Sequence, residues 1–142
     1  IDAYCGIGTI SLTLAKHVKK VYGVEVVPQA IADAKENAER NHITNAEFVC
    51  DDAGHFMTEF VERNEKVDCV MVDPPRKGCS TEFLERLTTL SPERIVYISC
   101  NVATQARDLT YLVEKGYKPL DVQPVDMFPH TPHIENILLL SK

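Results

Sequence analysis

The chain has 142 residues, a length that suits a single domain with a sizeable core. Hydrophobic residues make up 44% and charged residues 25%, as in ordinary soluble globular domains, and no apolar run is long enough to cross a bilayer. The net charge of −6 argues against a broad nucleic-acid-binding face within these residues.

The five cysteines are odd in number and include no C-x-x-C pair, so neither a disulfide framework nor a zinc site is predicted. A reducing, cytoplasmic setting is the simplest interpretation. Cys50 and Cys69 fall within predicted strands and are expected to be core thiols. Because Ile1 begins inside what reads as a strand, we expect the chain to be one domain, residues 1–142, of a longer protein.

Strand and helix patterns alternate along the chain, which predicts an α/β fold with a mostly parallel sheet and helices on both faces. The apolar start predicts a first strand, and six more are expected at residues 21–26, 46–50, 67–72, 94–99, 119–125 and 134–140. Helices are predicted at residues 9–20, from Pro28 to a loop at 41–45, and at 53–64, 81–90 and 103–115. The last two strands have no helix between them and should pair antiparallel, giving a seven-stranded sheet. This layout is similar to class I S-adenosylmethionine-dependent methyltransferases.

A glycine-spaced turn, Cys5-Gly6-Ile7-Gly8-Thr9, joins the first strand to the first helix. Glycine lets the backbone turn sharply and approach a ligand, although tight packing alone also uses glycines here. Glu25 ends the next strand 17 residues after Gly8, near the spacing expected for a carboxylate that holds ribose hydroxyls. Ser11 stands where a dinucleotide motif has its third glycine, so a nucleoside cofactor without a pyrophosphate is favoured.

Polar residues follow the carboxyl ends of the predicted strands, where open α/β sheets bind ligands. Asp51 and Asp52 follow the third strand, Asp73 the fourth and Cys100 the fifth. Any one of them could be a cap or turn residue, and Asp51 or Asp52 is a good N-cap for the next helix. Convergence of so many polar positions on one edge favours a binding site.

Two segments carry reactive side chains. Asp73-Pro74-Pro75-Arg76 is a rigid strand end that is similar to the D-P-P motif of methyltransferases acting on bases or amides. Cys100 lies in Ser99-Cys100-Asn101 before a predicted helix, whose N-terminal end favours a thiolate, although a small buried residue would fit there too.

The segment 128–135, Phe-Pro-His-Thr-Pro-His-Ile-Glu, offers two histidines and a carboxylate. This proline-broken loop matches no common zinc pattern, so no metal is predicted. The favoured interpretation pairs Glu135 with Cys100, as a proton acceptor and a nucleophile on one sheet edge.

Taken together, D-x-Y-C-G-x-G-T, G-V-E, D-P-P-R-K-G, S-C-N and F-P-H-T-x-H-x-E resemble the RNA uracil-C5 methyltransferase family. The resemblance implies S-adenosylmethionine-dependent formation of 5-methyluridine in transfer or ribosomal RNA, with 23S rRNA favoured over tRNA. It implies Cys100 as nucleophile and Glu135 as base. It also implies that the cofactor is contacted by residues of the strand ends and the glycine turn: Tyr4, Gly6, Gly8, Thr9, Glu25, Asp52 and Asp73.

Family members often have proline after S-C-N, where this chain has Val102. The family's N-terminal part, with an RNA-binding β-barrel and in some members an iron–sulfur cluster, is not in this sequence, so RNA is expected to bind through that part. We expect Phe128, Tyr97 or Pro75 to stack on the target base. Two alternatives remain open: a methyltransferase with another base or small molecule as substrate, and a non-catalytic cofactor-binding module.

Overall fold

A computed structural model describes all 142 residues, and its backbone divides into two compact units, Ile1–Phe56 and Met57–Lys142. No helix in it has the length and apolar character needed to cross a bilayer. The strands are β1 (Val21–Glu25), β2 (Ala46–Cys50), β3 (Cys69–Val72), β4 (Arg94–Ser99), β5 (Lys118–Val125) and β6 (Glu135–Ser141). The helices are α1 (Thr9–Leu14), α2 (Pro28–Arg40), α3 (Ala53–Glu62), α4 (Thr81–Leu90) and α5 (Val102–Glu114), with the 3₁₀ turn η1 (Ala15–His17) after α1.

The first unit is built on the parallel pair β1 and β2, in register from Val21 opposite Ala46 to Glu25 opposite Cys50. Phe48 of β2 is the large side chain of its core, which α2 covers with small and aliphatic residues. Gly23 lies so close to the Phe48 ring that a Cβ on this glycine would be 2.6 Å from it. A bulky strand residue is therefore accommodated because its neighbour has no side chain.

The prediction of a seven-stranded sheet is wrong in its first strand. The segment before the glycine turn makes only one isolated parallel bridge, Asp2 with Gly23, and the six strands form a two-stranded and a four-stranded ladder. The first helix is also shorter than predicted, because α1 ends at Leu14 and tightens into η1.

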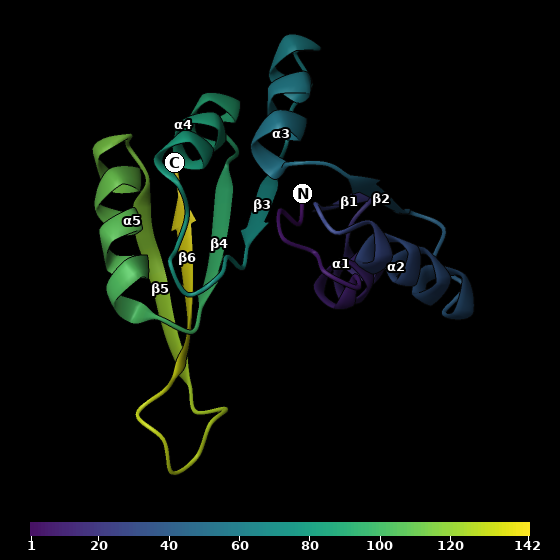
Figure 1. Cartoon of the computed structure of the whole chain (residues 1–142). Helices are drawn as coiled ribbons and strands as arrows, with labels where there is room; N and C mark the ends of the chain where they lie inside the picture. Colours follow the sequence, from purple (N-terminus) through teal and green to yellow (C-terminus); the bar gives the residue numbers. More distant parts are fainter. The chain divides into compact units, whose positions relative to one another are not determined.

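In the second unit the strand order is β3-β4-β6-β5, with β3 parallel to β4 and the other pairs antiparallel. The predicted antiparallel pairing of the last two strands is confirmed. In Figure 1, α4 and α5 lie side by side against this sheet, and the loop joining β5 to β6 projects beyond the end of the hairpin.

Alternate residues of β4 and β6 are buried, as expected for strands with one face on a core. The fully buried side chains of this core include Tyr97, Ile95, Leu112 and Leu140. Strand β5 differs, because seven of its eight residues are exposed and it forms an outer edge of the four-stranded order. The β4–β6 pair is thus the fixed centre from which the functional loops extend.

Candidate active site

The glycine turn of the first unit has the backbone that its sequence requires. Gly6 and Gly8 have φ of +51° and +86°, a region that side chains disfavour. A Cβ on Gly8 would lie 2.9 Å from the Phe48 ring, so Gly8 serves packing, whereas a Cβ on Gly6 would meet nothing within 4 Å. The packing interpretation thus holds for Gly8, and the open space lies at Gly6.

Glu25 lies beside that open space, at the end of β1. One of its carboxylate oxygens, Oε2, accepts the Gly6 N–H at 3.3 Å, and the other, Oε1, accepts the N–H groups of Val26 and Val27 at 2.8 and 3.1 Å. The structure therefore brings together two residues predicted for the cofactor, and these contacts hold the carboxylate in one orientation.

Asp2, a buried carboxylate with no predicted role, supports the same turn. Asp2 is fully buried, its Oδ2 accepts the Ser11 hydroxyl at 2.7 Å, and its Oδ1 has no partner. Burial raises the pKa of Asp2. Ser11 occupies the position where a dinucleotide motif has glycine, and here its hydroxyl ties the start of α1 to the segment before the turn.

The remaining predicted cofactor residues of this unit lie beside the turn and at the start of two helices. Tyr4 lies directly before the glycine turn and Thr9 begins α1. Asp52 caps α3, since its Oδ1 accepts the His55 N–H at 3.1 Å, while the Asp51 carboxylate pairs with the His55 ring at 2.7 Å. Capping is thus one role of Asp52, and it engages one of the two carboxylate oxygens.

In the second unit, Asp73 follows β3 and Cys100 follows β4, as predicted. Cys100 lines a pocket of about 200 Å³ together with Arg76, Phe128 and His133. Arg76 comes from the D-P-P-R segment, and Phe128 and His133 come from the β5–β6 loop. Three motifs that are far apart in the sequence therefore meet around one half-buried thiol.

Arg76 and His133 are in direct contact in this pocket. The Arg76 guanidinium donates to Nδ1 of His133 at 3.0 Å. The loop is shaped by Thr131, whose hydroxyl donates to the Phe128 carbonyl at 2.7 Å and accepts the His133 N–H at 3.2 Å. The His133 ring is thus engaged by an arginine, and the loop presents an aromatic ring to the pocket that Cys100 lines.

Side chains of α5 and of its N-cap residue hold the D-P-P-R-K-G loop by donating hydrogen bonds to the backbone carbonyls of the loop. The Asn101 amide and the Thr104 hydroxyl donate to the Arg76 carbonyl at 3.0 and 3.2 Å. The Arg107 guanidinium donates to the carbonyls of Lys77 and Cys79 at 3.1 and 3.0 Å. Because α5 begins two residues after Cys100, the same helix end places both the thiol and the arginine loop.

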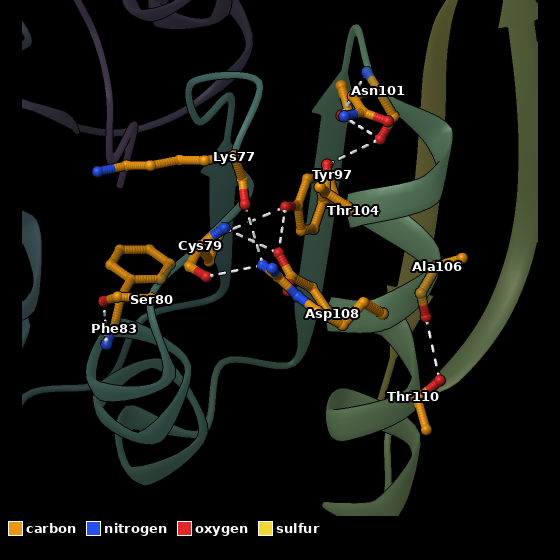
Figure 2. A network of polar contacts seen from close by, with 12 residues as sticks. Lys77, Cys79, Ser80, Phe83, Tyr97, Asn101, Thr104, Ala106, Asp108 and Thr110 are labelled. Atoms are coloured by element: carbon orange, nitrogen blue, oxygen red, sulfur yellow. Dashed lines mark hydrogen bonds and ion pairs between the residues drawn. The ribbon is translucent and has the colours of Figure 1, made fainter.

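Asp108 is the buried centre of this network, part of which Figure 2 shows with Tyr97 and Cys79 pointing toward it. Its Oδ2 accepts the Tyr97 hydroxyl at 2.6 Å and the Cys79 N–H at 2.8 Å, and its Oδ1 accepts the Arg107 guanidinium at 2.8 Å. Burial raises the pKa of Tyr97, so the phenol stays a hydrogen-bond donor. The prediction that Tyr97 stacks on a substrate base is therefore wrong, because its ring is fully buried.

Glu135 is the first residue of β6, and it does not line the pocket. Its relation to Cys100 follows from the register of β4 and β6, in which Ser99 pairs with Asn136. One residue further along, at the end of this ladder, the two strands present Cys100 and Glu135. The predicted nucleophile and base thus leave neighbouring antiparallel strands at the same sheet end.

The other thiols differ in setting. Cys5 is buried, and burial first, with the charges of Asp2 and Glu25 after it, raises its pKa to about 12. Cys79 is buried and contacts the Tyr97 hydroxyl at 3.6 Å. Cys50 is exposed, so its prediction as a core thiol is wrong: the residue ends β2 with its side chain outside the core.

The chain has an α/β fold of the class I S-adenosylmethionine-dependent methyltransferase type. It is similar in fold to an rRNA methylase from Streptococcus thermophilus, with a TM-score of 0.75 and 18% identity over 99% of this chain and 84% of that one. All 142 residues match the model of the tRNA (uracil-5-)-methyltransferase family. The chain belongs to that family.

Two relatives are closer in sequence. A Bacillus cereus protein named as an RNA methyltransferase is 55% identical over the full chain. The structure of Pyrococcus abyssi tRNA (uracil-54, C5)-methyltransferase in complex with S-adenosyl-L-homocysteine is 38% identical over 98% of the chain, with a TM-score of 0.79. The chain spans 31% of the length of the first relative and 33% of the second.

Proposed function

We propose that residues 1–142 form the catalytic domain of an enzyme that methylates C5 of uridine in RNA, with S-adenosylmethionine as methyl donor. The observation that carries the proposal is the pocket around Cys100, lined by Arg76, Phe128 and His133 beside the strand end that bears Glu135. Its volume of about 200 Å³ is smaller than that of pockets for drug-sized ligands and suits a single planar base.

The first unit offers what a nucleoside cofactor needs. A carboxylate held by three backbone N–H groups suits a ribose diol, and the open space at Gly6 leaves room for the ligand beside it. We assign cofactor contacts to Tyr4, Gly6, Gly8, Thr9, Glu25 and Asp52 here, and to Asp73 of the second unit. When bound, S-adenosylmethionine supplies a methyl carbon activated by a sulfonium.

Cys100 and Glu135 divide the remaining chemistry. Uracil C5 is a weak nucleophile, and the Cys100 thiolate overcomes this by forming a bond to C6, which moves the C5–C6 electron pair into an enolate. C5 then bonds to the methyl carbon, and the sulfonium sulfur would keep the electron pair of its broken bond to that carbon as a thioether. Glu135 removes the proton that C5 still carries, the C5–C6 double bond returns, and the sulfur leaves C6 as thiolate. The phenyl ring of Phe128 is the stacking partner proposed for the base, which must leave its own stack to enter the pocket.

The net charge of −6 and the relatives' greater length support a further part of the proposal. RNA is held mainly by a region outside these 142 residues, and this chain handles only the target nucleotide. We take 23S rRNA as the first substrate to test. Transfer RNA is the second, because the family description and the Pyrococcus abyssi relative name it.

The test is mass spectrometry of the full-length protein after incubation with 5-fluorouridine-substituted RNA and S-adenosylmethionine. Fluorine at C5 cannot leave as a proton, so an RNA adduct should be trapped on the Cys100 peptide. Cys100→Ala should abolish the adduct, and Cys50→Ala, which removes an exposed thiol, should not. Cofactor binding without any adduct would overturn the uracil-C5 proposal and favour another substrate or a binding role.

The RNA class is settled by a second experiment. Total RNA from a strain that lacks the protein is separated into rRNA and tRNA, and each fraction is offered with methyl-labelled cofactor. Label in 5-methyluridine of 23S rRNA alone would support the first choice, and label in tRNA alone would replace it.

A further inference from the structure

Two buried side-chain amides lie near the sheet end that bears the proposed nucleophile and base. Gln105, in the first turns of α5, is 3% exposed, and Asn136, the second residue of β6, is 9% exposed. The Asn136 side-chain amide donates to Oε1 of Gln105 at 2.6 Å. The Gln105 amide donates in turn to the backbone carbonyls of Asn136 at 3.2 Å and of Tyr97 at 2.9 Å. One side chain of α5 therefore binds both β4 and β6.

These bonds lie next to the two reactive groups. Asn136 follows Glu135 in the chain, and it pairs in register with Ser99, which precedes Cys100. The backbone on either side of Cys100 is also fixed, because the Ser99 hydroxyl accepts the Asn101 N–H at 3.0 Å and lies 3.1 Å from the Asn101 carbonyl. Cys100 and Glu135 are thus each one residue away from a position tied to the first turns of α5.

Burying a polar pair has no evident advantage for folding. Replacing both partners of a buried hydrogen bond by apolar groups of similar shape is nearly neutral, or even stabilising. What the amides provide is direction, since their hydrogen bonds are satisfied in one arrangement of α5, β4 and β6 only. An apolar pair would pack there without directing hydrogen bonds from α5 to the end of β4 and the start of β6.

We propose that Gln105 is a positioning residue, which acts through Asn136 to set the Glu135 carboxylate relative to the C5 proton that it removes. The inference rests on the function proposed above. It concerns one step of the reaction: formation of the sulfur–C6 bond depends on Cys100, whereas removal of the C5 proton depends on the reach of Glu135. A base must come within hydrogen-bonding distance of its proton, and misplacement by about 1 Å costs up to about a hundredfold in rate.

The proposal predicts an unequal effect on the two steps. In full-length Gln105→Met, adduct formation should stay within about twofold of wild type, and proton removal should slow by about ten- to a hundredfold. A methylated protein–RNA adduct should then accumulate. It is measured on denaturing gels with methyl-labelled cofactor and unmethylated RNA from a strain lacking the protein. Gln123→Met is the matched control, because Gln123 is an exposed glutamine of β5, and it should leave no adduct.

Two further variants separate positioning from stability. Gln105→Met/Asn136→Leu removes both amides, and it should unfold within a few degrees of wild type yet still accumulate the adduct. Glu135→Gln, which lacks the base itself, marks the largest accumulation to be expected. If Gln105→Met alone does not fold, accumulation of the methylated adduct is measured instead in the double variant and in Asn136→Leu.

Each outcome is decisive. Normal turnover in the double variant, or adduct formation and release slowed equally, would overturn the positioning role while leaving the proposed function intact. Absence of any adduct in Glu135→Gln, together with no trapping by 5-fluorouridine in wild type, would overturn the proposed function and this inference with it.

Discussion

The phenol of Tyr97 donates a 2.6 Å hydrogen bond to the carboxylate of Asp108, eleven residues further along the chain. Both residues are buried. The bond joins the middle of β4 to α5, the helix that also binds the loop carrying Arg76. Because Asp108 also accepts the Cys79 N–H and the Arg107 guanidinium, its loss would leave several donors without an acceptor.

Asp108→Asn is therefore expected to lower the free energy of unfolding by about 2–4 kcal/mol, because one acceptor oxygen becomes a donor facing other donors. Urea unfolding of the 142-residue chain measures this change. Asp121→Asn, the same substitution at an exposed position of β5, is the control and should stay within about 0.5 kcal/mol of wild type. A loss below about 1 kcal/mol for Asp108→Asn would show that the network contributes little.

Gly78→Ala should be costly for both stability and activity. Gly78 has φ of +76°, and a Cβ there would lie 2.7 Å from both the Arg107 guanidinium and the Asp108 carboxylate. Strain and displacement together are expected to cost about 2–3 kcal/mol and to shift the Arg76 loop. Gly116→Ala is the matched control, since Gly116 has φ of +95° with open space around it, and should cost about 1 kcal/mol. Equal losses in thermal unfolding would mean that backbone strain alone matters at both sites.

Glu25→Gln should weaken cofactor binding. The substitution keeps the size of the side chain but replaces an oxygen that accepts backbone N–H groups by a donor, so the group facing the proposed ribose is reoriented and uncharged. A loss of about ten- to a hundredfold in affinity for S-adenosylhomocysteine is expected by calorimetry. Glu47→Gln on β2, which removes an exposed ion pair with Lys20, should bind as wild type. Unchanged affinity in Glu25→Gln would remove Glu25 from the cofactor site.

The protein should lose stability in alkaline solution through groups that ionise less readily when folded than when unfolded. Burial raises the pKa of Tyr117 to about 12. Burial, together with the charges of Asp2 and Glu25, likewise raises the pKa of Cys5 to about 12. Because these groups ionise more readily when unfolded, their contribution to stability is complete below about pH 9 and is lost as the pH rises toward 12.

Tyr117→Phe tests this dependence. It removes the hydrogen bond to the Pro92 carbonyl, so the variant should be less stable than wild type at pH 8. Between pH 10 and 12 its stability should fall less steeply, because one titrating group is gone. Urea unfolding across this range measures the slope, with Tyr111→Phe on α5 as the control. Identical slopes for Tyr117→Phe and wild type would show that Tyr117 does not titrate as described.

The sequence predicted the positions of Cys100 and Glu135 in the fold better than it predicted the contacts around them. Cys100 and Glu135 lie in compact local motifs, and strand boundaries from hydrophobic patterning placed each at a strand end. The contact between Arg76 and His133 joins residues 57 positions apart, and no local pattern signals such a pair. Asp108 and Gln105 were missed because a polar residue on a helix ordinarily indicates a solvated face, and only the packing of α5 on the sheet shows that these two are buried.

The prediction of the first strand was wrong for a different reason. A few apolar residues before a glycine turn are typical of a strand, but a ladder needs length on both partners. Here Asp2 contributes a single bridge to Gly23, and its buried carboxylate accepts the Ser11 hydroxyl. The helix that follows was predicted too long. The helix propensity of residues 15–20 does not reveal that α1 continues only as the 3₁₀ turn η1, which ends at His17.

The exposed edge strand β5 has a consequence for how the protein behaves in concentrated solution. Its outer side presents backbone groups that a second molecule could extend into a continuous intermolecular sheet, the usual route to aggregation. Pro119 and Pro124 interrupt the row of donors, and the pairing with β6 shifts between Pro119 and Asp121. Replacing the two prolines would restore backbone N–H donors to this edge, so the prolines make the exposed strand a poorer template for pairing with a second molecule.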